Sequence, residues 1–212
     1  MTRHHPDSLI LMEYSAGNLS EAHAVCIRLH LDKCSHCRSR VDSLDSLGAV
    51  MMEQQAQVSV SESMFDSILA RIDQQPPEVM PEPKPPRQDL LTKLLGNDLN
   101  GLPWKKQLGD VSVLDITERF PGQKDRVVLQ KLCAGGKAPV HTHRGDETTV
   151  VLQGAFCDNR GVFNQWDFVV LGQEDEHKPV ALEGDDCITL SVLSAPLKLT
   201  GTFTRLLNPF IR

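Results

Sequence analysis

The chain has 212 residues, of which 40% are hydrophobic and 24% charged, and its 22 Lys and Arg against 28 Asp and Glu give a net charge of −6. No run of about 18 consecutive apolar residues occurs, and the first ten residues hold no segment apolar enough for a signal peptide, so we expect a cytoplasmic protein without a membrane span. The acidic balance and the lack of clustered Lys and Arg argue against direct nucleic-acid binding, which needs cationic contacts to phosphate.

Apolar residues at helical spacing dominate the N-terminal third. We predict helices in HPDSLILMEYSAGN, in SEAHAVCIRLHL with Ser20 as N-cap, in CRSRVDSLDSLGAVMMEQQ and in SESMFDSILARID. The fourth of these places its apolar side chains on one broad face, formed by Met64, Phe65, Ile68, Leu69 and Ile72. The ordinary interpretation of such a face is a core position.

A proline-rich stretch then divides the chain. Residues 74–87 read QQPPEVMPEPKPPR, and their six prolines favour an extended, semi-rigid conformation. We therefore predict a helical domain over residues 1–75, a linker over residues 76–88 and a second domain over residues 89–212.

Short β-rich runs separated by turn residues follow a short helix predicted in DLLTKLLG, residues 89–96. The runs are VSVLDI, DRVVLQKL, TTVVLQGAF, WDFVVL, CITLSVLS and LTGTFTRLL. Their number and spacing indicate an all-β sandwich or barrel. We expect three cysteines of this region to be buried strand residues, namely Cys133, Cys157 and Cys187.

A first group of metal-ligand residues lies in the helical part. His30, Cys34 and Cys37 form H-x3-C-x2-C, and a structural zinc site needs one further ligand. The candidates are His5, His4, His23 and His36, of which His5, beside the first helix, is the best placed. The alternative, a thioredoxin-like redox pair, would need a βαβ context that the sequence does not show.

This pattern, a His about 25 residues before H-x3-C-x2-C in a small helical domain, resembles the zinc-binding anti-sigma domain of bacterial regulators of extracytoplasmic-function sigma factors. The resemblance implies that His5, His30, Cys34 and Cys37 bind a structural zinc ion. It also implies a second use for the fourth helix, whose apolar face would clamp the sigma factor.

A second group lies in the β-rich part, in GGKAPVHTHRGDETTVVLQG. Gly135, His141, His143, Glu147 and Gly154 stand at the offsets of the first cupin motif, which this stretch resembles. The resemblance implies a double-stranded β-helix, or jelly-roll barrel, that holds zinc or another divalent metal, with a fourth ligand from the second motif. That ligand would be His177, although Glu174 and Ala181 replace the usual Gly and Asn of the second motif.

Over its whole length the chain resembles ChrR-type anti-sigma factors, which join an anti-sigma domain to a cupin. The resemblance implies an α+β fold with two domains, a 1:1 complex with a cognate sigma factor, and its release in response to singlet oxygen or organic hydroperoxides. The protein would then be a negative regulator of transcription and not an enzyme. The alternative is a cupin metalloenzyme, a dioxygenase or hydroperoxide-processing protein, that carries a zinc module for assembly.

Overall fold

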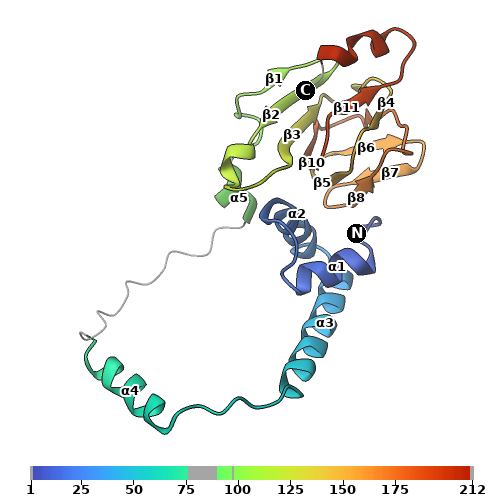
Figure 1. Ribbon diagram of the computed structural model, residues 1–212. Coiled ribbons are helices and arrows are strands. Elements are labelled where there is room, and N and C mark those ends of the chain that lie inside the picture. The colour runs from blue at the N-terminus through green and yellow to red at the C-terminus, as the bar shows by residue number, and fades with distance from the viewer. Residues whose placement is uncertain (1, 76–89, 97, 211–212) are drawn as a thin grey trace.

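The computed structural model describes residues 2–75, 90–96 and 98–210 (Figure 1). A helical N-terminal part and a β-rich cupin-like part are present, which confirms the predicted fold class. The predicted linker, residues 76–88, lies outside the described residues. No helix within the described ranges is long and apolar enough to cross a membrane.

Four helices form the N-terminal part, at the predicted places: α1 (Ser8–Ser15), α2 (Glu21–Leu31), α3 (Ser35–Glu53) and α4 (Glu62–Asp73). Asp7 caps α1 because its Oδ1 accepts a hydrogen bond from the Ile10 N–H at 2.8 Å. α3 begins two residues earlier than predicted, since Cys34 is its N-cap and the Cys34 Sγ accepts from the Cys37 N–H.

α4 lies apart from the other helices and from the cupin (Figure 1). None of its residues is buried, and its apolar side chains are exposed, Phe65 by 68% and Ile72 by 55%. The interpretation of this face as a core position is therefore wrong.

The cupin part contains α5 (Leu90–Leu95) and three antiparallel sheets. The first sheet has the strand order β1-β2-β3-β10-β5-β8, the second pairs β11 with β4, and the third has the order β7-β6-β9. The strands are β1 (Lys105–Lys106), β2 (Val111–Asp115), β3 (Arg126–Leu132), β4 (His141–His143), β5 (Glu147–Gln153), β6 (Ala155–Asp158), β7 (Gly161–Asn164), β8 (Phe168–Leu171), β9 (Val180–Ala181), β10 (Cys187–Leu193) and β11 (Leu197–Leu199), with the 3-10 helices η1 (Thr117–Arg119) and η2 (Thr204–Phe210).

The six-stranded sheet is covered on both faces. Along β5, Val150 and Leu152 belong to the core cluster that also contains Ile27 of α2, whereas Val151 belongs to the cluster inside the barrel with Phe156. Because successive side chains of a strand point to opposite faces, burial on both faces requires an almost continuous apolar run. The core of the helices therefore continues into the outer face of the cupin, with α2 lying against the sheet (Figure 1).

Gly154 divides the run TTVVLQGAF, which the sequence analysis treats as one strand. Its φ is +64°, and a Cβ there would lie 2.6 Å from the Asp186 carbonyl oxygen, so only glycine fits this bend. β5 ends before Gly154 in the first sheet, and β6 begins after it in the third.

The prediction of a strand in residues 199–207 is wrong. β11 ends at Leu199, and η2 begins at Thr204 after a turn in which the Arg205 N–H donates to the Gly201 carbonyl. The Asn208 side chain folds back on Leu199: its Oδ1 accepts from the Leu199 N–H at 2.7 Å, and its Nδ2 donates to the Leu199 carbonyl at 2.9 Å. An amide side chain thus takes the place of a neighbouring strand.

The prediction for the three cysteines is correct only for Cys187, which is buried in β10. Cys157 is half-buried, and Cys133, which follows the end of β3, is exposed. Burial in a strand cannot be predicted for a residue that lies one position past the end of the pairing.

Candidate metal centres

The first group of ligand residues converges at the end of α2. His5, His30, Cys34 and Cys37 each place a ligand atom within 4.8 Å of the others. His5 Nδ1 lies 3.4 Å from His30 Nε2 and 3.4 Å from the Sγ atoms of Cys34 and Cys37. The last turn of α2 positions His30, and the start of α3 positions both thiols. The other candidates of the helical part lie outside this group, namely His4, His23 and His36.

The chemistry of these four residues fits a structural zinc ion. The His30 Nδ1–H donates to the Trp166 carbonyl at 2.7 Å, which leaves the Nε2 lone pair facing the group. Burial and the neighbouring Cys34 raise the pKa of Cys37 to about 12, because two adjacent thiolates without a cation repel each other. For Cys34, hydrogen bonds from Thr2 and from the Cys37 N–H outweigh burial and lower its pKa. Two thiolates and two imidazoles are a common tetrahedral zinc set.

The second group lies inside the barrel. His141, His143 and His177 are all buried, and their ring nitrogens converge within 4.8 Å. His177 Nε2 lies 3.0 Å from His141 Nε2 and 3.4 Å from His143 Nε2. β4 presents His141 and His143 on one face, two residues apart, and a backbone bridge between residues 141 and 177 brings in the third ring. His177 is therefore not an exposed turn residue.

Glu147 lies beside these three imidazoles, at the start of β5. Its Oε2 is 3.2 Å from His143 Nδ1, but the Nδ1 atom has no hydrogen-bond partner among the described residues. Its Oε1 accepts from Gln130 Nε2 at 3.1 Å and from the Thr149 hydroxyl at 2.8 Å. The ligand atoms that lie within 4.8 Å of one another are those of the three histidines, and Glu147 stands beside this group and not within it. The residues present fit a divalent metal.

Two acceptors orient the imidazoles. The Pro139 carbonyl accepts from His141 Nδ1 at 2.8 Å, and Asp158 Oδ2 accepts from His177 Nδ1 at 3.0 Å. Asp158 is itself held by Arg160 at 2.8 Å. Because Nδ1 is engaged in both His141 and His177, the Nε2 lone pair of each of these two rings points into the group. Sequence reasoning missed Asp158, since no local pattern connects it to a histidine 19 residues away.

The protonation states also suit a cation. Burial and the neighbouring His141 lower the pKa of His177 to about 4, so its ring is neutral at pH 7. Burial alone would raise the pKa of Glu147, but the His143 contact and the Thr149 hydroxyl outweigh it and lower the pKa to about 2. Neutral imidazoles and an ionised carboxylate are the forms that bind metals.

These pKa values predict acid sensitivity of the metal-free protein. Between the unfolded pKa of 6.5 and the folded pKa of about 4, His177 binds a proton only in the unfolded state, so lowering the pH through this window favours unfolding. We expect the melting temperature in excess chelator to fall steadily from pH 7 to pH 4.5. His177→Gln should reduce this dependence of the melting temperature on pH. An unchanged dependence in the variant would refute its assignment to His177.

The helical part and the cupin meet at the turn between β7 and β8. Asp167 is fully buried there, and its Oδ1 accepts from the Arg3 N–H at 2.6 Å and from the His4 N–H at 3.2 Å. The Phe168 N–H donates to the His4 carbonyl at 3.1 Å. The preceding residue, Trp166, has a φ of +72° and supplies the carbonyl that orients His30. The segment that carries His5 is thus fastened to the cupin.

We expect Asp167→Asn to destabilise the chain by about 1–3 kcal/mol, since a buried carboxylate that accepts backbone N–H groups loses its charge. Because the neighbouring His5 loses its anchor, the variant should also release zinc to a chromogenic chelator faster than the parent. Asp185→Asn, at an exposed position of the same domain, is the control and should change neither the melting temperature nor the release rate.

Comparisons with known proteins show the family to which the chain belongs. A family model described as the ChrR cupin-like domain matches residues 96–196. The anti-sigma-E factor ChrR of Cereibacter sphaeroides is 36% identical over 215 residues, covering 99% of this chain and 98% of the relative. The chain belongs to the ChrR family of anti-sigma factors.

A solved structure supports the ChrR-family fold over both parts. The crystal structure of Rhodobacter sphaeroides SigE in complex with the anti-sigma ChrR matches with a TM-score of 0.74 and 35% identity, over 91% of this chain and 100% of that ChrR chain. Membership of the ChrR family therefore accounts for the combination of helices and a cupin in one chain.

Proposed function

We propose that this chain sequesters a cognate extracytoplasmic-function sigma factor in a 1:1 complex in the cytoplasm and releases it under singlet oxygen or organic hydroperoxide stress. The observation that carries the proposal is the end-to-end similarity to the anti-sigma-E factor ChrR. In this proposal the protein is a negative regulator of transcription and has no catalytic activity.

The proposed sigma-binding surface is the apolar face of α4, which we call the α4 stripe: Met64, Phe65, Ile68, Leu69 and Ile72. Each of these side chains is more than 40% exposed, and no residue of α4 is buried. An amphipathic helix with an unpartnered apolar face is suited to lie in the groove of another protein. Exposed apolar area of this kind is costly in water, which supports a partner as its occupant.

The two ligand groups have separate proposed roles. We propose that zinc bound by His5, His30, Cys34 and Cys37 holds α1–α3 together so that α4 can act. We propose that the cupin residues His141, His143, Glu147 and His177 bind zinc or another divalent metal and belong to the sensing domain, residues 89–212. Residues 1–75 would bind sigma, and residues 76–88 would link the two.

Co-expression with an extracytoplasmic-function sigma factor from the same genome, the one encoded beside this chain if there is one, tests the proposal. We expect one peak on a sizing column that contains both proteins at 1:1, with about two metals per copy of this chain, one for each ligand group. Failure of the two proteins to co-elute would refute sigma binding. A redox-active cupin metal with turnover of an added substrate would instead favour the metalloenzyme.

The sensing role is tested by His141→Ala combined with Glu147→Ala. We expect this variant to bind sigma as the parent does, because α4 is far from the barrel (Figure 1), but to leave the sigma-dependent reporter uninduced by singlet oxygen. Lys198→Ala, an exposed substitution on β11, is the control and should respond normally. Full induction in the double variant would refute a role for the cupin metal in release.

A further inference from the structure

A second, larger cavity opens beside the cupin ligand group. It has a volume of about 600 Å³, within the range of roughly 300–1000 Å³ usual for small-molecule sites. Four residues line both this cavity and the small space at the ligand group: Val111, Gln130, Ala138 and His141. The cavity therefore adjoins the space at the ligand group, and His141 is common to both.

Most of the cavity wall is hydrocarbon. Apolar side chains of β2, β3, β10, β11 and η2 contribute to it: Val113, Val128, Leu193, Leu199 and Leu207. An apolar wall of this extent favours a ligand with a hydrocarbon portion, because burial of apolar surface drives its binding.

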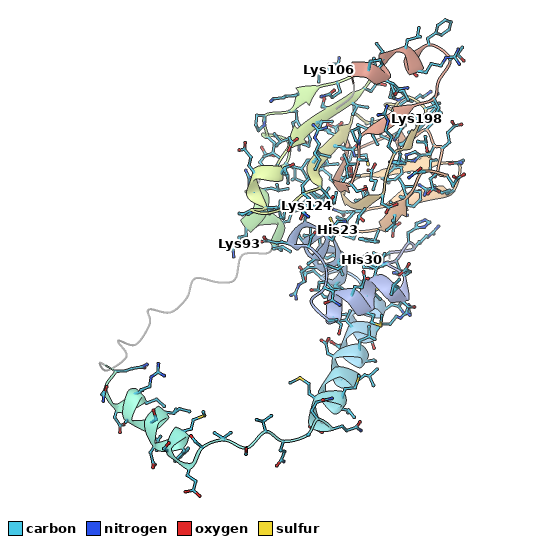
Figure 2. All side chains as sticks on the ribbon, viewed as in Figure 1. His23, His30, Lys93, Lys106, Lys124 and Lys198 are labelled. Atoms are coloured by element: carbon cyan, nitrogen blue, oxygen red, sulfur yellow. The ribbon has the colours of Figure 1, made fainter. Side chains whose placement is uncertain are left out.

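The charged groups of the wall have one sign. Lys124 and Arg126 line the cavity, whereas no Asp or Glu of the described ranges does. Arg126 is paired with Asp115 at 2.7 Å, but Lys124 forms no ion pair with any described residue. Lys124 lies close to the junction between the cupin and α2 (Figure 2). The positive charge of Lys124 favours the binding of an anionic head group at this place in the wall.

The donors of the wall near the ligand group are already engaged. Gln130 Nε2 donates to Glu147 and to Ser191, and His141 Nδ1 donates to the Pro139 carbonyl. An anion would therefore find a hydrogen-bonding cation at Lys124 and an apolar passage towards His141. A cation in one part of the wall and hydrocarbon in the rest suit the head and the tail of an amphipathic acid.

We propose that this cavity binds an amphipathic monocarboxylate, a fatty acid of medium chain length, with its carboxylate at Lys124 and its tail extending towards His141. This inference does not depend on sigma binding. It gives the barrel an organic ligand in addition to the metal that its histidines fit, and it places the tail of that ligand against a residue of the ligand group.

Calorimetric titration of the purified full chain with sodium dodecanoate tests the inference. We expect one dodecanoate per chain, no binding of butyrate, which lacks the tail, and much weaker binding of dodecyltrimethylammonium, which has the same tail and the opposite charge. Absence of dodecanoate binding at submillimolar concentration, or equal binding of the cationic compound, would overturn it.

Two variants locate the ligand. Lys124→Gln should weaken dodecanoate binding about fivefold, as expected for loss of a partly exposed ion pair, whereas Lys106→Gln on β1, outside the cavity wall, should leave it unchanged. Val113→Phe, at a half-buried position of β2, should narrow the cavity and abolish binding while the melting temperature is retained. Equal effects of the two lysine substitutions would show that dodecanoate binds elsewhere and would overturn the proposal.

Discussion

Phe65→Asp combined with Leu69→Asp is expected to weaken sigma binding by at least about 100-fold, because two charges would have to be desolvated in the groove that receives the α4 stripe. The stability of the free protein should not change, since Phe65 is 68% and Leu69 43% exposed. Titration of labelled sigma with the purified variant measures the affinity, and thermal unfolding of the same sample measures the stability.

Ser67→Asp is the matched control for this variant. Ser67 is an exposed polar residue of α4 that does not belong to the stripe, so the same new charge should leave the affinity for sigma unchanged. Equal loss of affinity in Ser67→Asp would show that the charge of the helix, and not its apolar face, determines binding. Unchanged affinity in the double variant would remove α4 from the interface.

Cys34→Ser combined with Cys37→Ser is expected to lower the metal content by one ion per chain and to abolish measurable sigma binding. Structural zinc contributes about 10–16 kcal/mol to the folding of small zinc-finger peptides, and without it the α2–α3 corner loses the bond that joins it to His5. Because α2 also packs on the cupin sheet, we expect loosening of α1 and α3 and not unfolding of the whole chain.

Metal analysis, helical circular dichroism and sigma titration measure these effects. Cys133→Ser is the control, because this thiol is exposed and belongs to neither ligand group, and it should behave as the parent in all three. A double variant that keeps its full metal content, or that still binds sigma as the parent does, would contradict the proposed role of zinc.

Short-range patterns account for what the sequence predicts well. The spacing of His30, Cys34 and Cys37 follows from one helix end and the next helix start, and the two-residue spacing of His141 and His143 follows from one strand. Glycines at fixed offsets add the bends of the barrel. These features depend on a few bonds along the backbone, and the structure brings their side chains together as the sequence predicts.

The features that the sequence does not predict depend on contacts between residues far apart in the chain. Asp167 is one of many acidic residues in the sequence, and only the fold places it against the backbone of Arg3 and His4. Asn208 replaces a strand partner for Leu199 through an amide side chain whose role no periodicity reveals. The β-branched composition of residues 199–207 therefore predicts a strand that tertiary contacts override.

The bond between Arg3 and Asp167 joins residues that are 164 positions apart. During synthesis the N-terminal segment leaves the ribosome first, and at roughly 5–20 residues per second its acceptor follows about 10–30 s later. The helices can assemble in that interval, but the residues beside His5 have no acceptor until the cupin turn has been made. In a nascent chain, or in a fragment that ends before the cupin, the segment that carries His5 therefore lacks its hydrogen bonds to Asp167. These bonds can form only after the cupin turn has been synthesised.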